Sequence, residues 1–323
     1  MAIENKEILV TGGAGFIGSN FINYWLKKHQ RGSIVNVDKL TYAANPDYVD
    51  HKSFSDRYEL IKADIANAKQ IESIIKDVDC VVNFAAESHV DNSIKSPEPF
   101  IRSNYVGVYN ILEAVRKYDI RFHQISTDEV FGSLPLDSSQ KFDEHSPYAP
   151  RNPYSATKAA ADMLVRSYIN TYGIKATISN CSNNYGPNQH REKLIPKTVY
   201  NAIHNFRIPI YGSGRQIRDW IHVLDHCSAI EAILERGRIG ETYLVSARNE
   251  QHNIDVVKKI LGILGKDESL IEYVSDRPGH DVRYAIDPKK IENELDWKPS
   301  IPFDEGLRDT VNHYASLFSN DLR

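Results

Sequence analysis

The sequence predicts an α/β fold in which a doubly wound parallel sheet is covered by helices on both faces and followed by a smaller C-terminal domain. Three observations predict it. In the first 180 residues or so, short apolar runs alternate with segments whose apolar residues recur at helical spacing. The short runs are apolar almost throughout, which is typical of strands buried on both faces. After Asn184, glycine and proline break the pattern into loops and short segments.

The elements are expected in the alternating order of a βαβ sheet. Strands are expected at 7–11, 33–38, 58–63, 80–84, 122–126 and 176–179. Helices are expected at 17–26, 71–78, 100–117 and 154–172, with a further one at 255–264. The helix at 154–172 stops at Gly173, which suits the left-handed residue that often ends a helix.

Two domains are expected from a length of 323 residues. The first covers residues 1–184 and receives a returning segment near 222–248, and the second is built from 185–221 and 249–323. Because loops on a rigid scaffold concentrate binding residues, we expect the loop-rich second domain to bind the substrate.

Composition excludes several classes of protein. Lys and Arg number 39 against 43 Asp and Glu, so the net charge of −4 argues against a nucleic-acid partner held by a broad basic surface. Three cysteines without metal-ligand spacing predict neither a disulfide framework nor a metal site. No run of about 18 apolar residues occurs and the first residues lack a signal-peptide pattern, so we expect a cytoplasmic protein with no membrane contact.

A glycine-rich turn follows the first strand. Residues 13–18 fit G-x-G-x-x-G, and Gly12, Gly15 and Gly18 fit its offset form. The turn opens a helix, and Asp38 stands 20 residues after Gly18 at the end of the next strand, so the pattern predicts a Rossmann-type dinucleotide site. Asp38 suits a ribose hydroxyl and would repel a 2′-phosphate, which favours NAD over NADP. Lys39 and Arg57 are the nearby cations that would weaken this preference.

Two groups of residues have catalytic chemistry. Tyr154 and Lys158 are four residues apart and share a helix face, where a lysine charge favours the phenolate. Asp128 and Glu129 directly follow the fifth strand, and ligands of open α/β sheets lie beyond the carboxyl ends of strands. Two adjacent carboxylic acids can divide the roles of acid and base if their surroundings separate their pKa values.

Motifs along almost the whole chain resemble the extended short-chain dehydrogenases/reductases and, more narrowly, the nucleoside-diphosphate-glucose 4,6-dehydratases. The matching stretches are 11–18, 38–43, 84–91, 126–132, 152–158, 181–187, 192–196, 218–220 and 277–287. The triplet Thr127-Asp128-Glu129 discriminates best, because related epimerases and decarboxylases keep the Tyr and Lys but usually lack the Asp-Glu pair.

The resemblance implies a mechanism. Tyr154, helped by Thr127 and Lys158, takes the proton of the sugar 4-hydroxyl while the hydride passes to NAD. Glu129 then removes the C5 proton, and protonated Asp128 gives its proton to the leaving 6-hydroxyl. The hydride returns to C6 and yields a 4-keto-6-deoxy sugar nucleotide.

The resemblance also implies binding residues. Those for NAD are Gly12, Gly15, Phe16, Ile17, Gly18, Asp38, Lys39, Leu40, Thr41, Asp64, Ile65, Phe84, Ala85, Ala86, Ser88, Ser103, Tyr154, Lys158 and Asn184. Those for the sugar nucleotide are Ser88, Thr127, Asn183, Glu192, Lys193, Arg218, Asn249, Arg277 and His280. Arg218 and Arg277 suit the diphosphate, because a guanidinium matches phosphate oxygens.

Alternatives stay open at this point. Phe131 stands where the family often has Tyr, and residues 132–146 form a short loop found in compact members that include UDP-glucose enzymes. The segment 277–280 leans toward dTDP-glucose, so both nucleotides are candidates. A sugar-nucleotide 4-epimerase using the same Tyr154 and Lys158, or a non-catalytic NAD-binding regulator, are the other functions considered. The resemblance further implies a homodimer formed through the helices that contain Asn104 and Tyr154.

Replacing Asp38 with Ala should relax the selectivity for NAD, because the carboxylate that accepts from the ribose hydroxyls is lost. Binding of NAD and NADP to the Asp38→Ala variant, measured by calorimetry, checks this. An NAD affinity equal to that of the unchanged protein would refute the assignment of Asp38.

Overall fold

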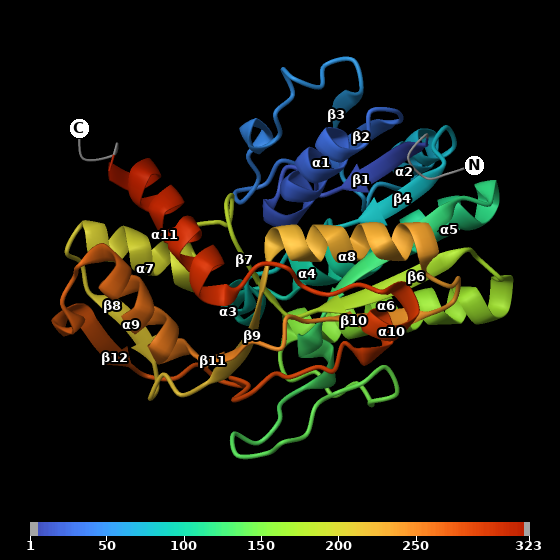
Figure 1. The fold of residues 1–323 in the computed structure, drawn as a ribbon. Coiled ribbons are helices and arrows are strands. Elements are labelled where there is room, and N and C mark those ends of the chain that lie inside the picture. The colour runs from blue at the N-terminus through green and yellow to red at the C-terminus, as the bar shows by residue number, and fades with distance from the viewer. Residues whose placement is uncertain (1–5, 320–323) are drawn as a thin grey trace.

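The computed structural model describes residues 6–319, so the first five and last four residues of the two expected domains lie outside it. Its largest feature is a seven-stranded parallel sheet with the strand order β10-β6-β5-β4-β1-β2-β3 (Figure 1). The strands are β1 (Glu7–Thr11), β2 (Ser33–Asp38), β3 (Tyr58–Lys62), β4 (Cys80–Asn83), β5 (Arg121–Thr127), β6 (Ala176–Cys181) and β10 (Thr242–Val245). The predicted fold class is confirmed.

Helices cover both faces of this sheet. One face packs against α2 (Ala68–Ile75), α5 (Val108–Tyr118) and α6 (Pro153–Tyr172) through a core that includes Ile71 and Val165. The other face packs against α1 (Phe16–Lys28) and α8 (Val223–Arg236) through Phe21, Trp25 and Ile230. Burial on both faces explains why the strands read as continuous apolar runs.

The strand order reverses beside β1, whose neighbours in the sheet are β2 and β4. In open α/β sheets, ligands bind at such a switch point, outside the carboxyl ends of the strands. Here β1, β4 and β5 end at Thr11, Asn83 and Thr127, so the glycine turn and the Asp128-Glu129 pair meet at one edge of the sheet.

The remaining strands form two small sheets. One has the order β11-β9-β7 and the other pairs β12 with β8. Their bounds are β7 (Asn183–Tyr185), β8 (Ile208–Tyr211), β9 (Ile217–His222), β11 (Glu250–His252) and β12 (Ile271–Val274). Figure 1 shows α7 (Leu194–Ile203), α9 (Asn253–Leu264) and α11 (Phe303–Ser319) gathered with β8 and β12 to one side of the large sheet. These helices share a core that includes Ile195, Val256 and Val311.

The helix expected at 100–117 is two elements. A π-helical segment, η3 (Ile101–Gly107), precedes α5, and Asn104 within it is buried. Its amide donates to the backbone carbonyl of Glu87 (3.0 Å) and accepts from the Glu87 N–H (2.8 Å). Apolar periodicity does not distinguish an α-turn from a single π-turn, which is why the sequence predicted one helix.

Short helical elements complete the chain: η2 (Pro46–Tyr48), α3 (Val90–Lys95), α4 (Glu98–Phe100), η4 (Asp128–Phe131), η5 (Glu268–Leu270) and α10 (Lys289–Leu295). Within residues 6–319, none of the helices combines the length and the hydropathy that crossing a membrane requires.

Candidate active site

The glycine turn fits tightly against the strand ends. Gly12 has φ +73°, and a Cβ there would lie 2.6 Å from the backbone nitrogen of Ala85. A Cβ on Gly18 would lie 2.4 Å from the carbonyl oxygen of Gly12. Helix α1 therefore starts directly on the turn, and its N-cap residue Gly15 supplies no side chain to occupy the first N–H groups. Such a helix start is suited to an anionic pyrophosphate.

Asp38 lies at the end of β2 beside this turn. Its carboxylate accepts from the N–H groups of Ala14 (3.0 Å) and Leu40 (2.7 Å). Burial raises the pKa of Asp38, while these two N–H groups act in the opposite direction. Of the two cations expected to weaken the NAD preference, Arg57 donates to the carbonyls of Leu26 and His29. The Arg57 side chain therefore lies at the start of β2 and β3, the end opposite Asp38, with its hydrogen bonds already made.

A cavity of about 610 Å³ runs along this edge of the sheet and collects most of the predicted residues. All the predicted NAD residues line it except Leu40, which has φ +58° and contributes its backbone N–H to Asp38. The five predicted catalytic residues line the same cavity. Lys39, at its rim, pairs with Asp64 at 2.9 Å.

Asp128 is buried at the start of η4 with little to stabilise a charge. Thr127 Oγ1 lies 3.3 Å from Asp128 Oδ1, and Oδ2 has no hydrogen-bond partner. Burial first, and then the nearby carboxylates of Glu129 and Asp219, raise the pKa of Asp128 well above its usual range. A carboxyl group in this state keeps its proton and can serve as an acid.

Glu129 has different surroundings. Burial raises its pKa, but the charges of Arg218, Arg277 and Lys193 act against that rise. The hydroxyl of Tyr284 lies 3.5 Å from Glu129 Oε2. The three cations around Glu129 favour the ionised form of Glu129. The surroundings of Asp128, in contrast, favour the neutral form of Asp128. The pair can therefore divide the roles of base and acid.

Tyr154 and Lys158 are both buried on α6. Burial first, and then Glu129, raise the pKa of Tyr154 well above its usual range. Burial lowers the pKa of Lys158, whose Nζ donates to the carbonyl of Ile125 at 2.7 Å. A phenol in this position needs positive charge nearby to lose its proton, and Lys158 lies one helical turn away.

The predicted substrate residues fall into two groups. Ser88, Thr127, Asn183, Glu192 and Lys193 line the cavity, where Lys193 Nζ donates to the carbonyl of Ser88 (3.2 Å). The other predicted residues, Arg218, Asn249, Arg277 and His280, lie outside its wall.

Each of these outer residues has partners within the chain. Arg218 donates to two backbone carbonyls and lies 4.2 Å from the ring centre of Tyr284. Arg277 pairs with Asp91 (3.3 Å), and His280 contacts Asp276 (2.6 Å). Arg218 and Arg277 are still close enough to influence Glu129, so they approach the site from the side of the small sheets.

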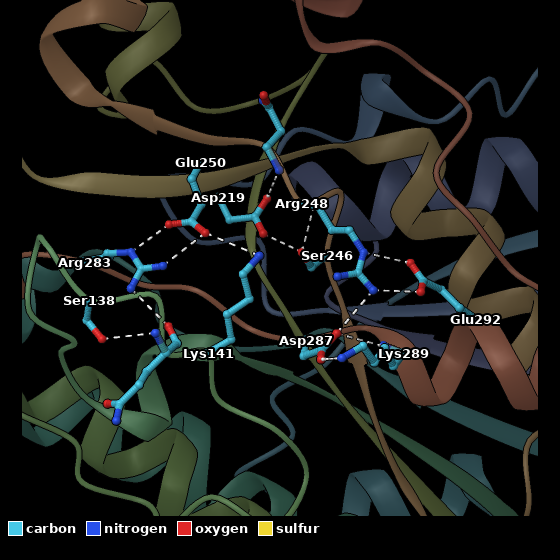
Figure 2. A network of polar contacts seen from close by, with 12 residues as sticks. Ser138, Lys141, Asp219, Ser246, Arg248, Glu250, Arg283, Asp287, Lys289 and Glu292 are labelled. Carbon is cyan, nitrogen blue, oxygen red and sulfur yellow. Dashed lines mark hydrogen bonds and ion pairs between the residues drawn. The ribbon is translucent and has the colours of Figure 1, made fainter.

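A polar network that includes Asp219, Ser246 and Arg248 (Figure 2) holds the backbone of the loop that carries Asn249. The buried carboxylate of Asp219 accepts from the N–H of Asn249 (2.9 Å) and from the hydroxyl of Ser246. Arg248, in the left-handed region with φ +55°, binds both oxygens of Glu292 (3.0 and 2.7 Å). Asn249 Nδ2 is buried without a partner. Its Oδ1 accepts from Gln251 Nε2 (3.0 Å), so only the amide nitrogen of Asn249 is left without a partner.

Sequence reasoning missed several residues of the site. Arg102, Gln189 and His190 line the cavity, and no motif or spacing singles them out. Tyr284, which contacts Glu129, lies inside the motif at 277–287 but carried no assigned role.

Comparison with known proteins agrees with this geometry. The family model described as GDP-mannose 4,6 dehydratase matches residues 9–310. The chain is 50% identical over 311 residues to a dTDP-glucose 4,6-dehydratase of Mycolicibacterium smegmatis, covering 96% of this chain and 93% of that protein.

Solved structures are similar as well. The dTDP-glucose 4,6-dehydratase of Bacillus anthracis, in complex with NAD, is 45% identical with a TM-score of 0.91, over 98% of this chain and 99% of that one. The dTDP-glucose 4,6-dehydratase of Streptomyces venezuelae, with NAD bound, is 40% identical with a TM-score of 0.93, over 96% and 97%.

The raised pKa of Asp128 predicts how the thermal stability of an Asp128→Asn variant depends on pH. Asp has a pKa of about 4 in the unfolded chain, so the wild-type protein loses stability as the pH rises from about 4 toward the raised pKa of the folded state. The total loss is about 1.4 kcal/mol for each unit by which the two pKa values differ. Asn does not ionise, so the melting temperature of the variant minus that of the wild type should increase from about pH 5 to about pH 8. Scanning fluorimetry measures it, with the exposed Asp137→Asn as control. A difference that stays constant with pH would contradict a buried, neutral Asp128.

Proposed function

Because the chain belongs to the nucleotide-sugar 4,6-dehydratase family, we propose that it converts dTDP-glucose to the 4-keto-6-deoxyglucose nucleotide with NAD as cofactor. The observation that carries the proposal is the contrast between two adjacent carboxyl groups in one cavity with Tyr154 and Lys158. Asp128 is held neutral, while Glu129 faces three cations. Water elimination requires an acid and a base of this kind on one sugar.

The residues present fit NAD. A Cβ at Gly12 or Gly18 would clash with backbone atoms of the chain itself, so only glycine allows the turn to pack this tightly between β1, the end of β4 and the start of α1. Asp38 and the start of α1 suit a ribose and a pyrophosphate. When bound, NAD supplies reversible hydride acceptance. Tyr154, Lys158 and Asn184 line the cavity where we place its reactive ring.

Tyr154 is the base of the oxidation step in this proposal. Its phenolate takes the proton of the sugar 4-hydroxyl, and the charge of Lys158 stabilises that phenolate. Thr127 lowers the pKa of Tyr154 through a hydrogen bond and lies on the cavity wall. The 4-ketone that results makes the C5 proton acidic.

Glu129 and Asp128 carry out the elimination. Glu129 removes the C5 proton, and Asp128 gives its own proton to the departing 6-hydroxyl, which leaves as water. In this step Glu129 becomes neutral and Asp128 becomes a carboxylate. The cations around Glu129 then no longer have its negative charge beside them. Return of the hydride to C6 and of a solvent proton to C5 completes the product.

The smaller part of the chain holds the nucleotide in this proposal. Lys193, Arg218 and Arg277 are the cations available to a diphosphate near Glu129. We retain the division into an NAD domain at 1–184 with 222–248 and a sugar-nucleotide domain at 185–221 with 249–323. The relatives named above act on dTDP-glucose, which supports this nucleotide over UDP-glucose.

We also propose a homodimer. Ile101 and Tyr105 of η3 and Met163 of α6 are 50%, 37% and 55% exposed, and they border an apolar hollow with Pro153 and Leu164. Such a continuous apolar surface on two neighbouring helices is typical of a subunit interface. A monomer in sedimentation velocity would contradict it.

The proposed function is tested by incubating the purified protein and NAD with dTDP-glucose and, in parallel, UDP-glucose. Mass spectrometry should show loss of one water from the sugar nucleotide, with the larger kcat/KM for dTDP-glucose. Formation of the galactose epimer without water loss would overturn the proposal, and equal kcat/KM values would overturn the choice of nucleotide.

Replacing Glu129 with Gln should preserve substrate binding and abolish exchange of the C5 proton with solvent, because the base is lost. We expect kcat to fall by about 10²-fold or more. Deuterium incorporation from heavy water, followed by NMR, measures the exchange, and the exposed Glu59→Gln serves as control. Undiminished exchange in the Glu129→Gln variant would remove Glu129 from the role of base.

A further inference from the structure

One buried carboxylate beside the site has no part in the reaction proposed above. Tyr154, Lys158 and Asp162 follow one another at four-residue spacing along α6 and so lie on one face of the helix. Asp162 is fully buried, with a relative exposure of 0%. Burying a carboxyl group is costly unless it is paired, so its presence there requires an explanation.

The hydrogen bonds of Asp162 indicate a charged group. Its Oδ2 accepts from Ser126 Oγ (2.6 Å), Tyr148 OH (3.1 Å) and Asn180 Nδ2 (3.1 Å). Its Oδ1 is buried without a partner, so a proton there would be a donor without an acceptor. Three donors to one carboxylate favour the ionised form.

Lys158 and Arg166 each lie four residues from Asp162 on α6, and Lys158 is the cation that opposes the raised pKa of Asp162 more strongly. The charged and titratable groups that face this pair are Arg166 of the same helix, Tyr148 of the loop before it and Cys181 of β6. Arg166 is engaged elsewhere: it donates to Tyr148 OH (3.0 Å) and to Thr242 (3.3 Å). Burial lowers the pKa of Lys158 and the charge of Asp162 opposes that shift.

Asp162 also connects α6 to the strand end that carries the other catalytic residues. Ser126, one of its donors, directly precedes Thr127. Asn180 of β6 donates both to Asp162 and to the carbonyl of Thr127 (3.1 Å). The helix with Tyr154 and the segment with Asp128 are thus attached to one carboxylate.

We propose that Asp162 is a positioning residue, which keeps Lys158 protonated beside Tyr154 and holds α6 in register with the end of β5. The inference rests on the proposed function, in which Tyr154 is the base. Because Asp162 lies nearer to Lys158 than to Tyr154 along the helix, its charge favours the pair of phenolate and ammonium over the uncharged pair.

The Asp162→Asn holoenzyme tests the proposal, since Asn keeps the shape and removes the charge. Loss of the negative charge of Asp162 lowers both apparent pKa values of the Tyr154–Lys158 pair, because a nearby negative charge disfavours loss of a proton. Both limbs of the kcat profile against pH should therefore move to lower pH by about one unit. The value of kcat should fall while KM for dTDP-glucose stays within about twofold, because less of the enzyme holds the charged pair.

Glu231→Gln is the matched control. Glu231 is also a buried carboxylate with three donors, Tyr24 (2.5 Å), Lys28 (2.5 Å) and His29 (2.7 Å), but it lies on α8, across the sheet. This variant should lose thermal stability and keep the wild-type pH limbs. Asp162→Glu, which retains the charge, should keep the limbs and lose kcat. Unmoved limbs in Asp162→Asn, or equally moved limbs in Glu231→Gln, would overturn the proposal.

A measurement on the unaltered protein does not depend on turnover, and it needs a variant only to assign one signal. In the holoenzyme labelled with ¹³C-lysine, the Lys158 signal, assigned by its loss in Lys158→Met, should be that of an ammonium at neutral pH. A neutral amine there would overturn the role of Asp162, even where dTDP-glucose is dehydrated. Failure to dehydrate dTDP-glucose would instead count against the proposed function and leave the Lys158 titration as an independent result.

Discussion

Removal of ionisable groups from water at the carboxyl edge of the sheet is the constraint on which the rest of the site depends. An ionised group that loses its water must find a partner or become neutral. Burial and the nearby carboxylates of Glu129 and Asp219 raise the pKa of Asp128, and the charge of Arg218 opposes them only in part. Glu129 faces three cations, and Lys158 faces Asp162. In the proposed reaction, the surroundings of these groups, and not their residue types, therefore determine which group acts as acid, which as base and which as cation.

The ionisation of Glu129, at the edge of the large sheet, depends on cations from the smaller part of the chain. Arg218 lies on β9, Arg277 follows β12, and Lys193 precedes α7, all outside the seven-stranded sheet. Arg218 is fixed by backbone carbonyls and by the ring of Tyr284, so its charge cannot follow a ligand far. In the proposed function, the cations that favour an ionised Glu129 are also those available to a diphosphate, so binding of the substrate would change the ionisation of the proposed base.

The sequence predicted β1 and β2 to the residue, because buried parallel strands are apolar throughout and the glycine turn marks where β1 ends. Of the residues predicted for NAD and for catalysis, all but Leu40 line the cavity, because most of them follow directly from strand ends and motifs. The sequence could not predict the π-turn at Ile101–Gly107, or the contact of Tyr284 with Glu129. Both arise from packing between segments far apart in the chain, which no local period records.

Asp128 and Asp162 show why burial alone does not fix ionisation. Both are Asp residues with almost no exposed surface, and burial raises the pKa of each. Asp128 has one hydroxyl at 3.3 Å, and its nearest charges are mostly negative. Asp162 accepts three hydrogen bonds on one oxygen and has Lys158 as its first opposing charge. In the proposals above, the number of donors and the sign of the neighbouring charge therefore distinguish Asp128, the proton donor on the cavity wall, from Asp162, a buried anion outside that wall. Neither property can be read from the spacing of the residues.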